Sequence, residues 1–140
     1  MVPRTPTNDH AESCLRECLE KEGFELSRRR GKGETGVDII AKRDGKEYFI
    51  EVIGFKKSPP QRTKDFCVVF FGAISRLKDG ARNIIIALPE RFGNGLHQRA
   101  KQYGEGWQRI GDIFPELEIW LVCCEEPYSY KKSKWNSWLS

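Results

Sequence analysis

The chain has 140 residues, of which 39% are hydrophobic and 31% charged, and its formal net charge is +4. This length suits one domain with a substantial core, and the composition suits a soluble globular protein. No apolar run approaches the ~20 residues needed to span a bilayer, which excludes a helical membrane protein.

The start of the chain and the cysteines indicate the compartment. Residues 1–8 lack the apolar core of a signal peptide and are expected to form a disordered lead-in. The five cysteines are an odd number, so we expect reduced, buried thiols in an intracellular, cytoplasmic protein. Zinc binding is conceivable, but the CxxC…CxxC spacing of structural sites is missing. His10 and His97 are isolated, and we interpret both as incidental.

A helix is predicted over residues 8–22. Asn8 or Asp9 can cap it, and Gly23 can end it. Its inward stripe has helical spacing and consists of Ala11, Cys14, Leu15, Cys18 and Leu19. Glu12 flanks or joins this stripe, which is an unusual position for an acidic residue.

A short strand over residues 24–27 leads into a basic loop over residues 28–36. The loop contains the run Arg28-Arg29-Arg30-Gly31-Lys32-Gly33, and a second basic cluster lies at residues 131–134. Such runs are either solvated surface or contacts for a polyanion such as nucleic acid.

A hairpin is predicted from two apolar-rich strands, over residues 37–42 and 47–53, that flank Asp44-Gly45. If these two residues form the turn, paired residue numbers sum to 89, so Asp38 faces Glu51. Opposed carboxylates are unfavourable unless a cation lies between them, and a divalent metal is the usual reason for such a pair. A register slip of one residue would instead make them ordinary strand acids on opposite faces.

The second half of the chain contains two more helical patterns and two apolar strands. After the break at Ser58-Pro59-Pro60, a helix is predicted from about residue 64 to 78. Its apolar face would consist of Cys67, Phe70, Phe71, Ile74 and Leu77. Strands over residues 83–88 and 117–124 flank a weaker helical pattern over residues 95–110.

This order predicts an α/β fold with a mixed central β-sheet flanked by helices. We expect a single domain over residues 9–126 and a basic, aromatic tail over residues 127–140. The tail either docks through its tryptophans or is a flexible arm.

The segment from Gly36 to Gly54 resembles the PD-(D/E)XK nuclease superfamily, in which an Asp on one central strand precedes a Glu or Asp on the next. Asp38 matches the first acid and Glu51 the second. The resemblance covers roughly residues 9–124 and implies a restriction endonuclease-like fold. It also implies Mg²⁺ or Mn²⁺ at the carboxylate pair, which would polarise the scissile phosphate and activate a water molecule.

The chain departs from the superfamily pattern at Ile53, where a catalytic lysine is expected. A lysine from elsewhere can compensate, and Lys56 or Lys57, reached by a bend at Gly54, is preferred to the more distant Lys42. Alternatively, a slower mechanism relies on the metal alone, or the site is degenerate.

The resemblance therefore implies a metal-dependent endonuclease-like domain that hydrolyses phosphodiester bonds in DNA. The expected catalytic residues are Asp38, Glu51 and Lys56. The expected metal ligands are Asp38, Glu51 and Glu12. The expected nucleic-acid contacts are Arg28, Arg29, Arg30 and Lys32, while Arg76 is either a further phosphate contact or an ion-paired arginine.

Two alternatives remain open. A degenerate member of the fold would bind DNA or a protein partner without cleaving, and a purely structural α/β protein would carry the two acids incidentally. Many proteins of this fold form homodimers, although no segment here requires one, and no membrane partner is expected.

Overall fold

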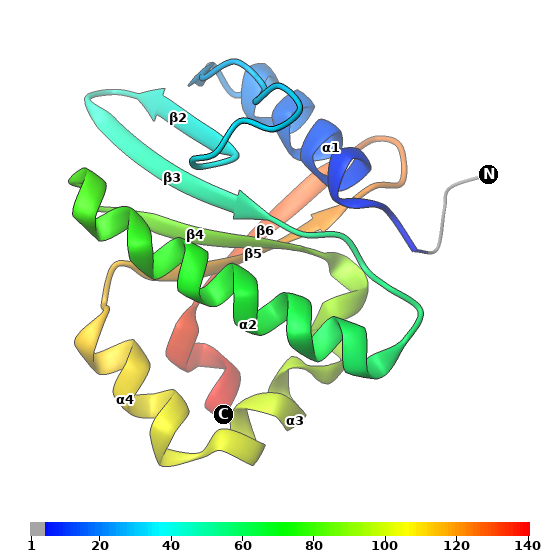
Figure 1. Ribbon diagram of the computed structural model, residues 1–140, viewed down its shortest axis with the longest axis vertical. Helices are drawn as coiled ribbons and strands as arrows, with labels where there is room; N and C mark the ends of the chain where they lie inside the picture. Colours follow the sequence, from blue (N-terminus) through cyan, green and yellow to red (C-terminus); the bar gives the residue numbers. More distant parts are fainter. Residues whose placement is uncertain (1–4) are drawn as a thin grey trace.

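The computed structural model describes residues 5–140 and contains a six-stranded sheet with the order β1-β2-β3-β4-β5-β6 (Figure 1). The strands are β1 (Glu25–Leu26), β2 (Ile39–Arg43), β3 (Lys46–Val52), β4 (Ile84–Pro89), β5 (Leu117–Cys123) and β6 (Ser129–Lys134). β3, β4 and β5 run parallel to one another, and the other neighbouring strands are antiparallel. The predicted mixed α/β architecture is confirmed.

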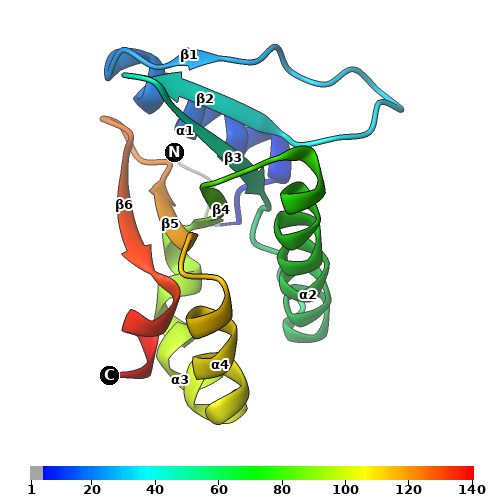
Figure 2. The same cartoon turned by 90° about the vertical axis from the view of Figure 1, so that its left-hand side faces the viewer.

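Helices cover both faces of this sheet. The four α-helices are α1 (Asn8–Lys21), α2 (Pro59–Ser75), α3 (Gly93–Tyr103) and α4 (Glu105–Ile113). The 3₁₀ turns are η1 (Arg76–Asp79), η2 (Glu90–Phe92) and η3 (Trp135–Leu139). α1 packs on one face, and α2, α3, α4 and η3 pack on the other (Figures 1 and 2). Within residues 5–140, no helix is long and apolar enough to cross a membrane.

The hairpin has the predicted register. Ile39 pairs with Ile50 and Arg43 with Lys46, so each pair sums to 89. Asp44 and Gly45 have φ angles of 53° and 76°, which is the geometry of a two-residue type I′ turn. β2 begins one residue after Asp38, and continuing the register by that residue sets Asp38 opposite Glu51.

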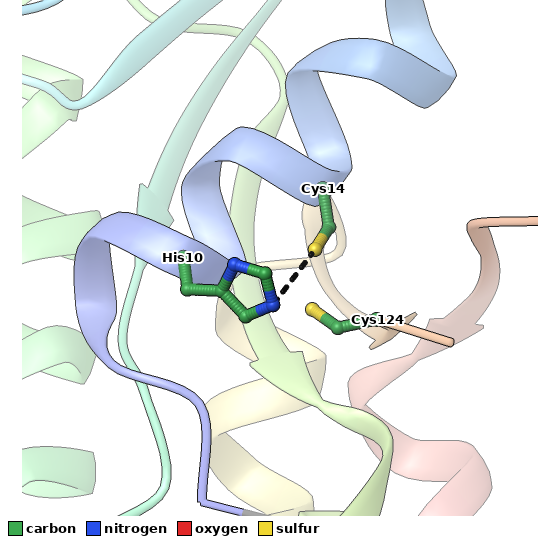
Figure 3. Close-up of side chains that lie close together, drawn as sticks. All are labelled: His10, Cys14 and Cys124. Atoms are coloured by element: carbon green, nitrogen blue, oxygen red, sulfur yellow. Dashed lines mark hydrogen bonds between the residues drawn. The ribbon is translucent and has the colours of Figure 1, made fainter. Parts of the chain in front are cut away.

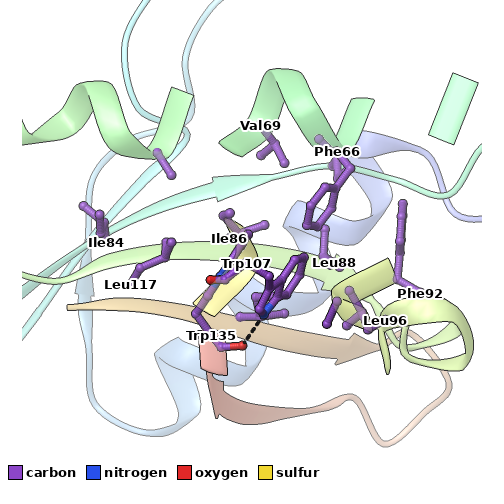
Figure 4. Close-up of a cluster of buried hydrophobic side chains, with 14 of the residues drawn as sticks. Phe66, Val69, Ile84, Ile86, Leu88, Phe92, Leu96, Trp107, Leu117 and Trp135 are labelled. Carbon is purple, nitrogen blue, oxygen red and sulfur yellow. Dashed lines mark hydrogen bonds between the residues drawn. The ribbon is translucent and has the colours of Figure 1, made fainter. Parts of the chain in front are cut away.

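The larger core lies between the sheet and α2, α3 and α4 (Figure 4). β4 is buried along its whole length because it is a central strand with helices on both faces. The rings of Trp107 and Trp135 stack with centroids 3.9 Å apart. Each indole N–H donates to the backbone carbonyl of the other residue, at 2.9 and 2.8 Å, so neither polar group is left unpaired.

The C-terminal tail docks on the domain and is not a flexible arm. Residues 129–134 form β6, which adds an antiparallel edge to β5, and Trp135 is buried immediately after it. At the other end of the chain, residues 1–4 of the expected lead-in lie outside the described residues. Thr7 accepts a hydrogen bond from the backbone N–H of His10 and caps α1, in place of the expected Asn8 or Asp9.

The predicted α2 differs from the observed helix in both its start and its buried face. The helix begins at Pro59, because Ser58 caps it and proline is tolerated in the first turn of a helix. Its buried residues are Phe66, Val69 and Ala73, whereas Phe71 is 70% exposed. Phe66 packs near the Trp107–Trp135 stack, with ring centroids 6.1 Å from each, and this contact sets the rotation of the helix.

Two further predictions need correction. The helical pattern over residues 95–110 is two helices, because Gly104 takes a φ of 54° between α3 and α4. The thiols are not all buried, because the rotation of α2 leaves Cys67 exposed and Cys123 is half-buried.

We predict that Trp135→Ala lowers the free energy of unfolding by about 3–5 kcal/mol, because it removes a buried ring and orphans the indole N–H of Trp107. Urea unfolding followed by circular dichroism measures this loss. Trp138→Ala is the matched control, since Trp138 is only half-buried, and its effect should be clearly smaller. Equal losses would show that docking of the tail does not depend on the stacked pair.

Candidate active site

A cleft of about 780 Å³ opens at the end of the hairpin that lies away from the turn. Its walls come from the first turns of α1, the basic loop, the ends of β2 and β3, and one side of α2. Glu12, Asp38 and Glu51 all line it. The structure therefore brings together the three carboxylates that were predicted as metal ligands.

Asp38 is held by the strand opposite it and by the basic loop. Its Oδ2 accepts a hydrogen bond of 2.8 Å from the backbone N–H of Val52. Its Oδ1 forms an ion pair with the guanidinium of Arg30, which returns from the loop eight residues earlier. The side chain of Asp38 is therefore anchored to the end of β3, although its backbone directly precedes β2.

Glu51 is the most strongly perturbed acid of the cleft. Its side chain is 12% exposed, and its Oε1 lies 3.4 Å from Nε of Arg76. Burial first, and then the Asp38 carboxylate, raise the pKa of Glu51 to about 7, against opposing effects of Arg76 and Arg30. Glu51 lies against Gly72 of α2, where an added Cβ would be 3.8 Å from the carboxyl group.

Glu12 is already paired. Its Oε2 is 2.7 Å from Nε of Arg16 and 3.8 Å from the guanidinium of Arg29. Arg16 is buried and also donates to the carbonyls of Ser27 (2.6 Å) and Asp38 (3.0 Å). Arg16 therefore fixes α1 against the start of β2, and Glu12 would have to share its carboxylate to contact a metal.

The arginines of the basic loop do not act as one group. Arg28 forms a bidentate pair with Glu34 at 2.9 and 2.7 Å and is not among the described residues that line the cleft. Arg29, Arg30 and Lys32 line it, and Lys32 is exposed at its rim. Three of the four predicted nucleic-acid contacts thus border the carboxylates.

The lysines that were expected to compensate for Ile53 do not line the cleft. Ile53 is 8% exposed and packs in the core beneath α2, although it also contributes to the cleft wall. Nζ of Lys56 is 3.6 Å from Asp65, and Nζ of Lys42 is 3.2 Å from Glu47. Among the described lining residues there is no Lys56, Lys57 or Lys42.

Gly54 explains where the chain goes after Ile53. A Cβ at this position would overlap the carbonyl of Pro6, and the Gly54 N–H donates to Oδ1 of Asn8 at 2.6 Å. The glycine serves close packing against the start of α1, and not a bend that returns Lys56 to the acids. Sequence reasoning missed the pairing of Arg30 with Asp38 and the burial of Arg16; the i,i+4 spacing of Glu12 and Arg16 was the available signal.

Comparison with known protein families gives a match over most of the chain. The model of a restriction endonuclease family, Mrr_cat, matches residues 5–110. The chain belongs to this restriction endonuclease family. The matched residues include every segment that lines the cleft, and the family is consistent with the PD-(D/E)XK superfamily and a nuclease-like domain. No curated protein and no solved structure matches the chain significantly.

The cleft of this nuclease-like domain suits a divalent metal, which members of restriction endonuclease-like families usually use. Carboxylate oxygens are the ligands that Mg²⁺ and Mn²⁺ prefer. Asp38 and Glu51 offer such oxygens side by side, and burial first, then the Asp38 carboxylate, raise the pKa of Glu51. A cation between them would compensate the negative charge that this buried pair carries when both are ionised, so the donor set fits the group.

We predict that the metal-free protein loses stability as the pH rises from about 4.5 to about 7. The pKa of Glu51 is higher in the folded protein than in the unfolded chain, so the folded state binds the extra proton in this window. Relative to Glu51→Gln, the loss should be on the order of 2–3 kcal/mol. Urea unfolding in the presence of a chelator measures both proteins, and parallel pH profiles would contradict the assignment.

Proposed function

We propose that this chain is a metal-dependent endonuclease domain that hydrolyses phosphodiester bonds in DNA. The observation that carries the proposal is the pair of carboxylates, Asp38 and Glu51, in a cleft whose other walls supply arginines. A buried carboxylate beside a second one, whose pKa is raised to about 7 by burial first and then by Asp38, is typical of a functional site and favours this proposal over a purely structural role.

In this proposal Asp38 and Glu51 hold Mg²⁺ or Mn²⁺, and Glu12 is the third candidate ligand. When bound, the ion would supply Lewis-acid polarisation of the scissile phosphate and a more acidic water molecule. A bound cation would favour the ionised form of Glu51. Arg30, which neutralises Asp38 when no metal is bound, becomes available for a phosphate oxygen at the same place.

Arg76 supplies the positive charge that the missing lysine would otherwise provide. Its side chain is 15% exposed and lies beside Glu51 on the wall of the cleft, where it can stabilise negative charge on the phosphate. Arginine stays protonated and cannot accept a proton from the attacking water, so a carboxylate or solvent must do so. We prefer Arg76 to Lys56, because Arg76 lines the cleft beside Glu51, whereas Lys56 is not among the described lining residues and pairs with Asp65.

Backbone binding of DNA is assigned to Arg29 and Lys32 at the rim, with Arg28 at the outer side of the loop. These side chains offer charge without base-reading geometry, so the contact they support is to phosphate.

We predict that the protein nicks or cuts DNA with Mg²⁺ or Mn²⁺ and that Asp38→Asn and Glu51→Gln each reduce the rate by about 100-fold or more. Such losses follow because a bound metal contributes several kcal/mol to transition-state stabilisation. Supercoiled, linear and branched DNA should be tested together. Glu47→Gln is the matched control, because Glu47 is an exposed acid on the same strand and face and should leave cleavage unchanged.

The second candidate is a degenerate member of the family that binds DNA without cutting it. Two features favour it: an isoleucine, Ile53, stands in place of the expected lysine, and Asp38 is already ion-paired with Arg30. Calorimetric titration with Mn²⁺ separates the two: absent binding supports degeneracy, whereas binding without turnover supports a site that lacks a base.

We predict that Ile53→Lys increases cleavage by about tenfold or more, since Ile53 contributes to the cleft wall on the face of Glu51 and a lysine there could assist proton transfer. The same change should lower stability, because it removes a buried apolar side chain. Ile53→Met controls for the altered packing. A lysine variant that binds Mn²⁺ and DNA yet cleaves no faster than the methionine variant would exclude this role.

A further inference from the structure

A second cluster of metal-binding side chains lies on the opposite face of the sheet from α2. His10 and Cys14 are one helical turn apart on α1, and Cys124 follows the end of β5 (Figure 3). Nε2 of His10 is 3.8 Å from Sγ of Cys14, and the three ligand atoms lie within 4.8 Å of one another. Residues 110 positions apart in sequence therefore point into one small volume.

The cluster has features that ordinary core thiols lack. Cys14 is fully buried and Cys124 is 8% exposed, but the His10 ring that faces them is only half-buried. The imidazole places a nitrogen ligand beside the thiols, and its half-buried ring leaves the cluster accessible from solvent on that side. Cys18, one turn further along α1, is also buried but is not part of the cluster.

We propose that His10, Cys14 and Cys124 bind a zinc ion, with water as the fourth ligand. Imidazole nitrogen and thiolate sulfur are the ligands that Zn²⁺ prefers, and three protein ligands plus water is an established coordination. In a tetrahedral site, Zn–N and Zn–S bonds place ligand atoms about 3.5–3.8 Å apart. The separation of His10 and Cys14 already has this value, and the widest separation must contract by about 1 Å, within the reach of side-chain rotation.

Charge also balances in this buried position. Each thiol releases its proton to solvent on binding, and two thiolates neutralise Zn²⁺ while His10 stays neutral. Burial raises the pKa of both thiols in the metal-free protein, so zinc binding should weaken as the pH falls and protons compete.

The ion would tie the start of α1 to the end of β5. The same helical segment carries Glu12 to the cleft on its other side, and Arg16 fixes it to β2. The zinc site is thus a structural link that is separate from the catalytic carboxylates, and its presence does not depend on cleavage activity.

The test uses the full chain, stripped of metal under reducing conditions and then titrated with Zn²⁺. We expect one tightly bound zinc per chain, a higher melting temperature, and, with Co²⁺, the intense visible bands of a tetrahedral site and a thiolate charge-transfer band. Cys14→Ser, Cys124→Ser and His10→Ala should each weaken zinc binding by more than about 100-fold. Cys18→Ser is the matched buried control, and Asp38→Asn controls for binding in the cleft; both should keep the ion.

Circular dichroism shows whether each variant folds, and His10→Ala is the variant least able to disturb the core because its ring is half-exposed. The proposal is overturned if the folded, reduced wild type binds no zinc, or if His10→Ala and Cys18→Ser bind it equally well. It is also overturned if zinc is lost with Asp38→Asn instead. A Cys14–Cys124 disulfide in protein that binds no zinc after reduction would assign the cluster to thiol redox chemistry.

Discussion

Asp44 and Gly45 close a two-residue turn whose positive φ angles match the twist of the paired strands, and this turn sets the register of β2 on β3. Because side chains alternate between the faces of a strand, a shift of one residue would move Glu51 from the cleft to the face covered by α1. The same shift would bury Glu51 among the apolar residues of the smaller core. The position of the two cleft carboxylates therefore depends on a turn about 20 Å away along the strands, at about 3.3 Å per residue.

Two carboxylates placed in this way need compensation, and the metal-free protein obtains it from two arginines, Arg30 and Arg76, and not from Arg16. Arg16 is buried at the back of the cleft and fixes backbone as well as Glu12, so its role is structural. Arg30 and Arg76 pair with Asp38 and Glu51 from segments on opposite sides of the hairpin. Even so, the pKa of Glu51 stays at about 7, because burial is its largest cause. The arginines reduce the repulsion without removing it, which leaves the pair receptive to a cation.

The sequence predicted the parts of the fold that depend on local rules. The turn residues and the alternation of strand residues predicted the register, and apolar residues at helical spacing predicted the buried face of α1. The buried face of α2 could not be predicted in this way, because apolar residues occupy several sides of that helix. Its rotation is decided by Phe66 against the Trp107–Trp135 stack, which unites segments 69 and 28 residues apart.

The candidate site also combines features that local sequence rules predict with features that only tertiary packing decides. The opposition of Asp38 and Glu51 could be predicted from the hairpin register, since both residues lie within one hairpin. Their ion pairs with Arg30 and Arg76 could not be predicted, because these arginines reach the acids only through tertiary packing. A lysine sought nearby in sequence is held elsewhere: Lys56 follows a segment that Gly54 packs against Pro6 and Asn8.

α1 connects these observations, because its first three turns serve different neighbours on different sides. Glu12 faces the cleft, whereas His10 and Cys14 face Cys124 at the end of β5. The backbone carbonyl of the preceding Pro6 accepts a hydrogen bond of 2.9 Å from the N–H of Phe55, just after β3. A displacement of this helix would therefore change the carboxylate cluster and the thiol cluster together. Zinc bound at the thiols would hold the helix in the orientation that the cleft requires, although the two sites share no ligand.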